Sequence, residues 1–188
     1  MPPIISKLST QRRVHRGEGG DTVSFVSPQY WMDRVAIEAV HARYFAALDR
    51  CDHEQVRSCF TTDLEARYVG VEPMHGLDAF MTLIGGFIAD VERGSIKIST
   101  HFMGNFHMAR VSGERAETEM PVVVYTVRPL DPGPGDTVTI RGIRYFDRLR
   151  KSGDEWLICE RVHTVDWQCA APASLAATFQ TRMRSPWS

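Results

Sequence analysis

Apolar residues recur every three or four positions in the first half of the chain and at alternate positions in much of the second half. The first spacing is typical of amphipathic helices and the second of strands. A helix is therefore predicted from Asp33, as its N-cap, to around residues 49–51. A short helix follows Asp52, which has Gln55 at the spacing of a capping box. A third helix is predicted between residues 76 and 94.

Strand patterns dominate the remainder of the chain. A short strand is predicted over residues 64–69, before the third helix. Four longer strands are predicted over residues 95–110, 116–128, 137–150 and 156–167. Three helices followed by a four-stranded antiparallel meander predict an α+β protein. A curved sheet around a helical layer would leave an apolar pocket suited to a small molecule.

One domain is predicted over residues 28–169, with a segment on either side of it. Residues 1–27 are polar and Gly-containing, without periodicity, and are predicted to form a disordered or loosely docked arm. Residues 170–188 form a C-terminal tail. Its Ala-rich part is compatible with a helix that docks on a neighbouring subunit.

Composition narrows the classes of protein to consider. A formal net charge of -1 gives no basis for binding nucleic acid or an anionic membrane surface. No run approaches the roughly 20 apolar residues of a membrane span, and the basic N-terminal region lacks the apolar segment of a secretory signal. The four cysteines form no C-x-x-C pair. They are interpreted as reduced thiols of a cytoplasmic protein.

Candidate chemistry is concentrated in the strand predicted over residues 95–110. Alternation would place His101, Met103, Asn105 and His107 on one face, and Phe102, Phe106 and Met108 on the other as a candidate subunit interface. Asp49, at the end of the first helix, faces the negative end of the helix dipole, which disfavours a carboxylate by up to about 1 kcal/mol. It is therefore either a functional residue with a partner or a solvated residue that ends the helix.

The last predicted strand carries charged residues among apolar ones. Its one face would hold Leu157, Cys159, Arg161, His163, Val165 and Trp167. An arginine among apolar neighbours is either buried with an acidic partner or faces a ligand, and both readings remain open. Further aromatic and apolar residues could shape a pocket or simply fill the core: Tyr30, Trp31, Phe45, Met103, Tyr125, Tyr145 and Trp167.

The order and spacing of these residues resemble the SnoaL-like, nuclear-transport-factor-2-like superfamily. The matching segments are Arg34-Val35-Ala36-Ile37 through Tyr44 to Asp49, then His101 with Asn105, then Trp156 with Arg161. The resemblance covers about residues 30–167. It is strongest to the branch that holds hexachlorocyclohexane dehydrochlorinase, scytalone dehydratase and bile-acid 7α-dehydratase. It implies a cone in which N-terminal helices pack inside a strongly curved, mainly antiparallel sheet.

The resemblance also implies a catalytic Asp49–His101 dyad, assisted by Arg161 and Tyr44. A carboxylate on one ring nitrogen would leave the other nitrogen to act as a base. Asn105, His163 and the residues that could shape a pocket would contact the substrate. An additional aspartate of the bile-acid enzyme has no clear counterpart, because the corresponding strand reads Pro121-Val122-Val123-Val124-Tyr125.

The function expected from these residues is a cofactor-independent lyase or isomerase acting on a small hydrophobic cyclic molecule. No cofactor is expected, and no metal, because the histidine spacing matches no standard ligand motif. Two other functions remain open: a polyketide-cyclase-like aldol cyclase, and a non-catalytic module that binds hydrophobic ligands. Self-association as a dimer or trimer is expected, with neither nucleic acid nor membrane as a partner.

Overall fold

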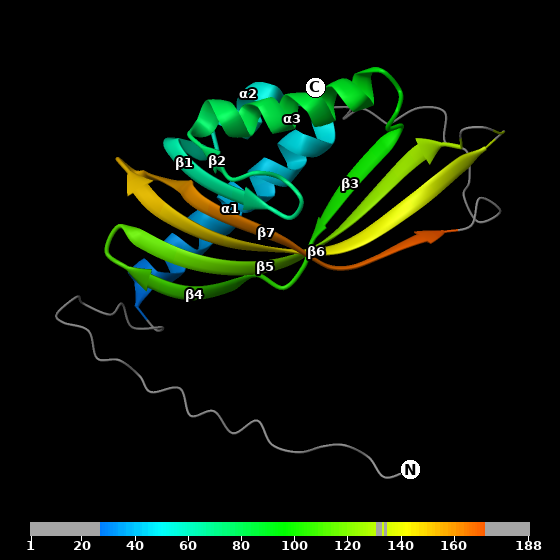
Figure 1. Ribbon diagram of the computed structural model, residues 1–188. Helices are drawn as coiled ribbons and strands as arrows, with labels where there is room; N and C mark the ends of the chain where they lie inside the picture. Colours follow the sequence, from blue (N-terminus) through cyan, green and yellow to red (C-terminus); the bar gives the residue numbers. More distant parts are fainter. Residues whose placement is uncertain (1–26, 131–132, 134, 172–188) are drawn as a thin grey trace, which may run out of the picture.

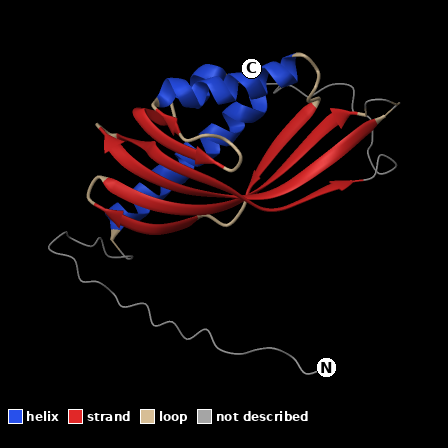
Figure 2. Ribbon diagram, in the orientation of Figure 1, coloured by secondary structure: helices blue, strands red, loops and turns tan. Residues whose placement is uncertain are grey.

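The computed structural model describes residues 27–130, 133 and 135–171. The elements are α1 (Pro28–Arg50), α2 (His53–Arg57), β1 (Phe60–Tyr68), β2 (Met74–His75), α3 (Leu77–Glu92), β3 (Ile98–Met103), β4 (His107–Ser112), β5 (Arg115–Pro129), β6 (Asp136–Ser152) and β7 (Glu155–Ala171). The seven strands form one sheet in the order β2-β1-β7-β6-β5-β3, with β4 also paired to β5 (Figure 1). The helices lie along the inner side of this bent sheet (Figure 2). The predicted α+β class and cone are confirmed.

The predicted meander is confirmed, but the sheet is mixed. Strands β3 and β4 pair with β5, β5 with β6, and β6 with β7, all antiparallel. Strand β1 instead lies parallel to β7, with Tyr68 opposite His163. This pairing joins the first and the last of the described strands and places β1 in the wall of the cavity described below.

Helix α1 begins six residues earlier than predicted, with its N-cap at Ser27 and not at Asp33. Its N-cap is Ser27, whose Oγ accepts a hydrogen bond from the Tyr30 backbone N–H at 3.1 Å, and Pro28 fills the first position, where no N–H is needed. Asp33 is not the cap. Its carboxylate is buried and accepts a hydrogen bond from Trp156 Nε1 at 3.1 Å. The predicted cap of the second helix is confirmed, since Asp52 Oδ1 accepts from the Gln55 N–H at 2.9 Å.

The strand predicted over residues 95–110 is interrupted, and the prediction of one continuous run is wrong. The Gly104 N–H donates to the Pro121 carbonyl at 2.9 Å, and a Cβ at Gly104 would lie 2.8 Å from that oxygen. Only glycine allows this approach, so the chain breaks between β3 and β4. Alternation does not continue across the break. Phe102 remains exposed on the outer face, whereas Met108 is buried in the core and Phe106 packs against it. Phe106 and Met108 therefore do not form an outer interface.

Two one-residue bulges shift the alternation of β7. The register skips Cys159 between the pairs Leu149–Ile158 and Arg148–Glu160, and skips Asp166 between Ile143–Val165 and Gly142–Trp167. The inner face therefore carries Trp156 and Ile158 before the first bulge, and Arg161 and His163 after it. Beyond the second bulge, Trp167 lies on the outer face. The face predicted for this strand is thus wrong at both of its ends.

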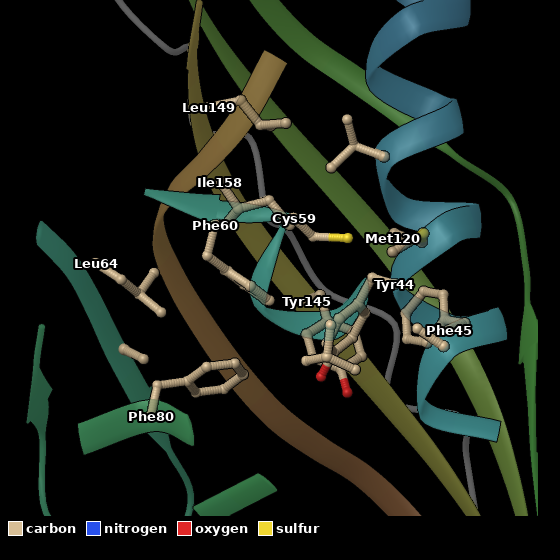
Figure 3. Close-up of a cluster of buried hydrophobic side chains, with 14 of the residues drawn as sticks. Tyr44, Phe45, Cys59, Phe60, Leu64, Phe80, Met120, Tyr145, Leu149 and Ile158 are labelled. Atoms are coloured by element: carbon tan, nitrogen blue, oxygen red, sulfur yellow. The ribbon is translucent and has the colours of Figure 1, made fainter. Parts of the chain in front are cut away.

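The core lies between the helices and the inner face of the sheet. Figure 3 shows Tyr44 and Phe45 from α1, Phe80 from α3, Cys59, Phe60 and Leu64 from the β1 region, and Met120, Tyr145, Leu149 and Ile158 from the remaining strands. All ten side chains are buried.

The chain's two flanking segments lie almost entirely outside the described residues. Ser27 is the N-cap of α1, and residues 170 and 171 end β7 as strand. The other residues of the predicted arm and tail are not described. Within the part of the chain that the structure describes, no helix is long and apolar enough to cross a membrane.

Candidate active site

A cavity of about 560 Å³ lies between the helices and the inner face of the sheet. Its walls come from α1, α3, β1, β3, β5, β6 and β7. The inner part is aromatic and apolar, and is lined by Tyr44, Leu48, Tyr68, Ile84, Phe87, Ile143 and Tyr145. Polar and charged side chains line the rest, among them His101, His163 and three arginines. An apolar cavity with a few converging polar groups is the usual form of a small-molecule site.

A second hollow of about 580 Å³ lies on the outer face of the sheet, and its charges largely neutralise one another. Arg148 pairs there with both Glu117 and Glu160, and Arg150 pairs with Asp63. Side chains that already satisfy each other leave little for a ligand to gain. The inner cavity is therefore the candidate site.

Asp49 and His101 meet at the edge of the inner cavity. Asp49 Oδ1 lies 2.7 Å from His101 Nδ1, and both carboxylate oxygens accept from the His101 backbone N–H, at 3.2 and 3.0 Å. These hydrogen bonds offset the unfavourable interaction between the Asp49 carboxylate and the negative end of the α1 dipole. A carboxylate accepts hydrogen bonds, so the ring proton is assigned to Nδ1, and Nε2 keeps its lone pair.

Aromatic side chains hold the His101 ring in place. Phe45 stacks on it with ring centroids 5.5 Å apart, and Phe87 approaches edge-on at 6.5 Å. His101 lines the cavity with a side chain that is only 9% exposed. Asp49 sits behind it and does not line the cavity. The two residues predicted to form a dyad are thus brought together, in the geometry of a histidine base oriented by a carboxylate.

The structure places Arg161 elsewhere than expected, because it is fully buried and does not line the cavity. Its Nε and Nη2 donate to Asp147 Oδ1 and Oδ2 at 2.9 and 2.6 Å. The guanidinium lies over the rings of Tyr44 and Tyr145, at 4.3 and 4.4 Å from their centroids. Arg161 therefore supports the aromatic wall from behind, and a direct contact with a substrate is not seen.

Sequence reasoning missed Asp147, and the bulge at Cys159 explains why. The strands predicted over residues 137–150 and 156–167 leave the turn where the structure has it, but pairing residues outward from that turn without a bulge sets Arg161 opposite Phe146. The extra residue moves Arg161 opposite Asp147 instead. The question left open by the sequence, a buried pair or a ligand-facing arginine, is answered by this cross-strand ion pair.

Two buried tyrosines contribute to the wall of the cavity. Tyr44 and Tyr145 both line it, and in Figure 3 their hydroxyl oxygens point to the same side of the core. Burial is the main cause that raises the pKa of both hydroxyls well above the usual value, and the nearby Tyr68 is the second. Both groups therefore stay neutral and can donate a hydrogen bond to an oxygen of a ligand.

His163 lines the cavity beside these tyrosines. Its ring stacks on Tyr68 at 4.5 Å and meets Tyr145 edge-on at 5.2 Å. Burial, followed by the charges of Arg161 and Arg141, lowers the pKa of His163 to about 4. The ring is thus neutral near pH 7, and its Nδ1 has no hydrogen-bond partner among the described residues.

A second histidine is kept neutral deeper in the core. His41 is fully buried, with Nε2 3.3 Å from Thr118 Oγ1 and Nδ1 3.4 Å from Asp147 Oδ2. The latter contact lacks hydrogen-bond alignment, since Nδ1 has no hydrogen-bond partner. Burial lowers the pKa of His41 to about 4 against the opposing effect of Asp147. His41 is therefore a core histidine and does not line the cavity.

Acidification is expected to destabilise the fold between about pH 6.5 and pH 4. In this window the unfolded chain binds protons on His41 and His163 that the folded chain does not bind, so the free energy of unfolding falls as pH falls. His41 alone would contribute about 3 kcal/mol over the window. Urea denaturation at a series of pH values measures this loss.

A His41→Gln variant separates the effect of His41 protonation on the free energy of unfolding from the effect of its packing. It should reduce the pH dependence to the part that His163 contributes, whereas Thr118→Val, which removes the neighbouring hydroxyl without removing a titrating group, should leave the slope unchanged. A wild-type stability that is constant across the window would contradict the prediction.

The predicted substrate-binding residues divide into two groups. The cavity is lined by Tyr44, His101, Tyr145 and His163, with Phe45 behind the His101 ring. Six others lie elsewhere: Tyr30, Trp31, Met103, Asn105, Tyr125 and Trp167. Tyr30 and Met103 pack with the core, and the remaining four are exposed. Tyr125 and Trp167 lie on the outer face, and Asn105 lies in the break between β3 and β4.

Several cavity residues were not predicted. Tyr68 comes from β1, whose parallel pairing was not foreseen, and Ile84 and Phe87 come from the apolar stripe of α3. Arg141 also lines the cavity. Its position could have been found, because it precedes Tyr145 by four residues in one strand and therefore shares its face. Across the described ranges, no group of three or more histidine, cysteine or acidic side chains is arranged to hold a metal ion.

Comparison with solved structures finds chains of the same fold. A candidate scytalone dehydratase from Novosphingobium aromaticivorans is 21% identical, with a TM-score of 0.65 over 82% of this chain and 97% of that one. A hexachlorocyclohexane dehydrochlorinase from Novosphingobium barchaimii is 13% identical, with a TM-score of 0.66 over 79% and 96%. A nuclear-transport-factor-2-like protein with a cystatin-like fold from Novosphingobium aromaticivorans is 24% identical, with a TM-score of 0.56 over 73% and 84%.

Comparison with curated proteins gives no significant match. The model of the SnoaL-like domain, in contrast, matches residues 29–162, which include nearly all of α1, the cavity wall from β1 to β6, and the first eight residues of β7. The match thus spans both Asp49 and His101. The chain therefore belongs to the SnoaL-like domain family, and the solved structures share its fold.

Proposed function

We propose that this chain is a cofactor-independent lyase of the dehydratase type that acts on a small hydrophobic cyclic molecule. The observation that carries the proposal is the 2.7 Å contact between Asp49 and His101 at the wall of an apolar cavity. A histidine oriented in this way can accept a proton near neutral pH. Isomerisation would start with the same proton abstraction and is the closest variant of the proposal.

The proposed reaction begins with His101 Nε2 removing a proton from a substrate carbon. The C–H electron pair forms a carbon–carbon double bond, and the bond to the leaving group on the neighbouring carbon breaks. Asp49 stabilises the imidazolium that forms, without itself taking the proton. The imidazolium then returns its proton to a departing hydroxide, so the products are an alkene and water.

The cavity wall supports this chemistry. The neutral hydroxyls of Tyr44 and Tyr145 can donate to an oxygen on which negative charge develops, in a site where little water weakens the contact. Arg161 acts as a positioning residue, since it holds both tyrosine rings from behind. The names of two structures with this fold, a dehydratase and a dehydrochlorinase, both denote eliminations and lend further support.

The proposal is tested by supplying hydroxylated and chlorinated cyclic compounds, including β-hydroxy ketones of steroid-like and polyketide-like shape, in deuterium oxide. The expected result is a conjugated alkene for at least one compound, together with deuterium exchange at the carbon next to the carbonyl. Tight binding of these compounds without elimination or exchange would instead favour a binding module. A new carbon–carbon bond would favour an aldol cyclase.

A further inference from the structure

Arg141 occupies a defined place opposite His101 in the cavity. Strand pairing sets His101 opposite Val124 on one side, and Arg141 opposite Val124 on the other. The three residues therefore form one row across β3, β5 and β6 on the inner face. Adjacent strands are about 4.8 Å apart, so the Cα atoms of His101 and Arg141 are separated by roughly 10 Å. A ligand that lies on Val124 has the base at one end and the guanidinium at the other.

Arg141 has no partner among the described residues, unlike the other arginines of its strand. Arg144, Arg148 and Arg150 each form ion pairs with carboxylates on the outer face. For Arg141 no ion pair or hydrogen bond is found within the described part of the chain, and its Nε is buried without an acceptor. A guanidinium that faces a cavity and lacks an acceptor is costly, and an anionic group of a ligand would remove that cost.

The neighbouring charges also favour an anion. Three arginines, Arg93, Arg128 and Arg141, line the cavity together with a single acid, Asp90. Arg93 bonds that acid at 2.6 Å, and Arg128 donates to the Ser95 carbonyl at 3.4 Å. Positive charge is therefore in excess in the wall of the cavity.

We propose that Arg141 binds a carboxylate carried by the substrate, so that the substrate class is an apolar ring bearing an acid group. This inference rests on the proposed function, and it adds the group that orients the ring toward His101. The planar guanidinium fork matches the two oxygens of a carboxylate. Val124 and Ile143, on the inner face between and beside the two ends, would contact the ring.

The experiment compares two ligands that differ only in charge, 1-naphthoate and 1-naphthamide, by isothermal titration calorimetry near neutral pH. The wild-type protein is expected to bind naphthoate about 10- to 100-fold more tightly than the amide, as charge-assisted hydrogen bonds usually provide. Arg141→Met should remove the preference, and Arg141→Lys should keep part of it. Arg144→Met, on the same strand but the opposite face, is the matched control and should behave as wild type.

Three outcomes would overturn the inference: equal affinity of the wild type for both ligands, no binding of naphthoate up to its solubility limit, or an unchanged preference in Arg141→Met. Unchanged melting temperatures show that the variants are folded. Because binding and turnover are measured separately, the two proposals can fail independently. A carboxylate preference that depends on Arg141 without any elimination activity would leave this inference standing and remove the proposed reaction.

Discussion

Replacing His101 with alanine is expected to lower kcat/KM about 10²- to 10⁴-fold on the substrate that is found, the usual contribution of a positioned general base. The loss should appear in kcat, because the imidazole acts on the reacting carbon and contributes little to binding the ring. The measurement is steady-state kinetics of alkene formation. The melting temperature should change little, since the side chain lines a cavity and the core beneath it remains filled.

Two further variants make this result specific. Asp49→Asn should cause a loss of similar size, because an amide facing Nδ1 favours the tautomer with its proton on Nε2 and removes the lone pair that acts as the base. His107→Ala is the matched control, since His107 is exposed at the start of β4, and should leave kcat unchanged. Full turnover by His101→Ala would show that the base is another group, and His163, the other histidine lining the cavity, would be examined next.

Replacing Asp147 with asparagine is expected to cost about 3–5 kcal/mol of stability, the usual penalty for removing one partner of a buried ion pair. Both side chains are fully buried, and Asp147 takes two of the hydrogen bonds that Arg161 can donate. The variant would leave a charged guanidinium beneath Tyr44 and Tyr145 without a compensating charge. Urea denaturation measures the loss, and part of the variant is expected in the insoluble fraction.

A double variant, Asp147→Leu with Arg161→Met, distinguishes a missing charge partner from lost packing. It should recover most of the stability, because two apolar side chains of similar size leave no buried charge. The exposed pair of Arg144 with Asp166 is the control, and Asp166→Asn should cause a far smaller loss. A double variant that is less stable than Asp147→Asn would contradict the explanation.

The helices and the antiparallel meander could be predicted because their signals are local. Apolar spacing locates α1, α2 and α3, and the Asp52 cap follows from a contact between residues three apart. The start of α1 was predicted at the wrong residue because Asp33 is a good capping residue by type. Its carboxylate instead accepts a hydrogen bond from Trp156, far along the chain. Such a distant partner is invisible in local patterns.

The contact between Asp49 and His101 could be predicted because the family shares the order and spacing of these residues. Asp49 and His101 come from different elements, and the family resemblance paired them. The sheet face on which each side chain of the long strands lies was harder to predict. A bulge of one residue moves every side chain beyond it to the opposite face. The bulge at Cys159 hid the Asp147–Arg161 pair, the bulge at Asp166 turned Trp167 outward, and the break at Gly104 removed Asn105 from the site.

The parallel pairing of β1 with β7 has a consequence for how the chain acquires its shape. A ribosome releases β1 early, but the neighbour against which it belongs is the last strand to emerge. Until then β1 and β6 each present an unpaired edge, the kind of surface on which chains aggregate. Contacts between such distant segments also slow folding. The nascent chain is therefore expected to need protection, by a chaperone or by slow synthesis, until its final strand closes the sheet.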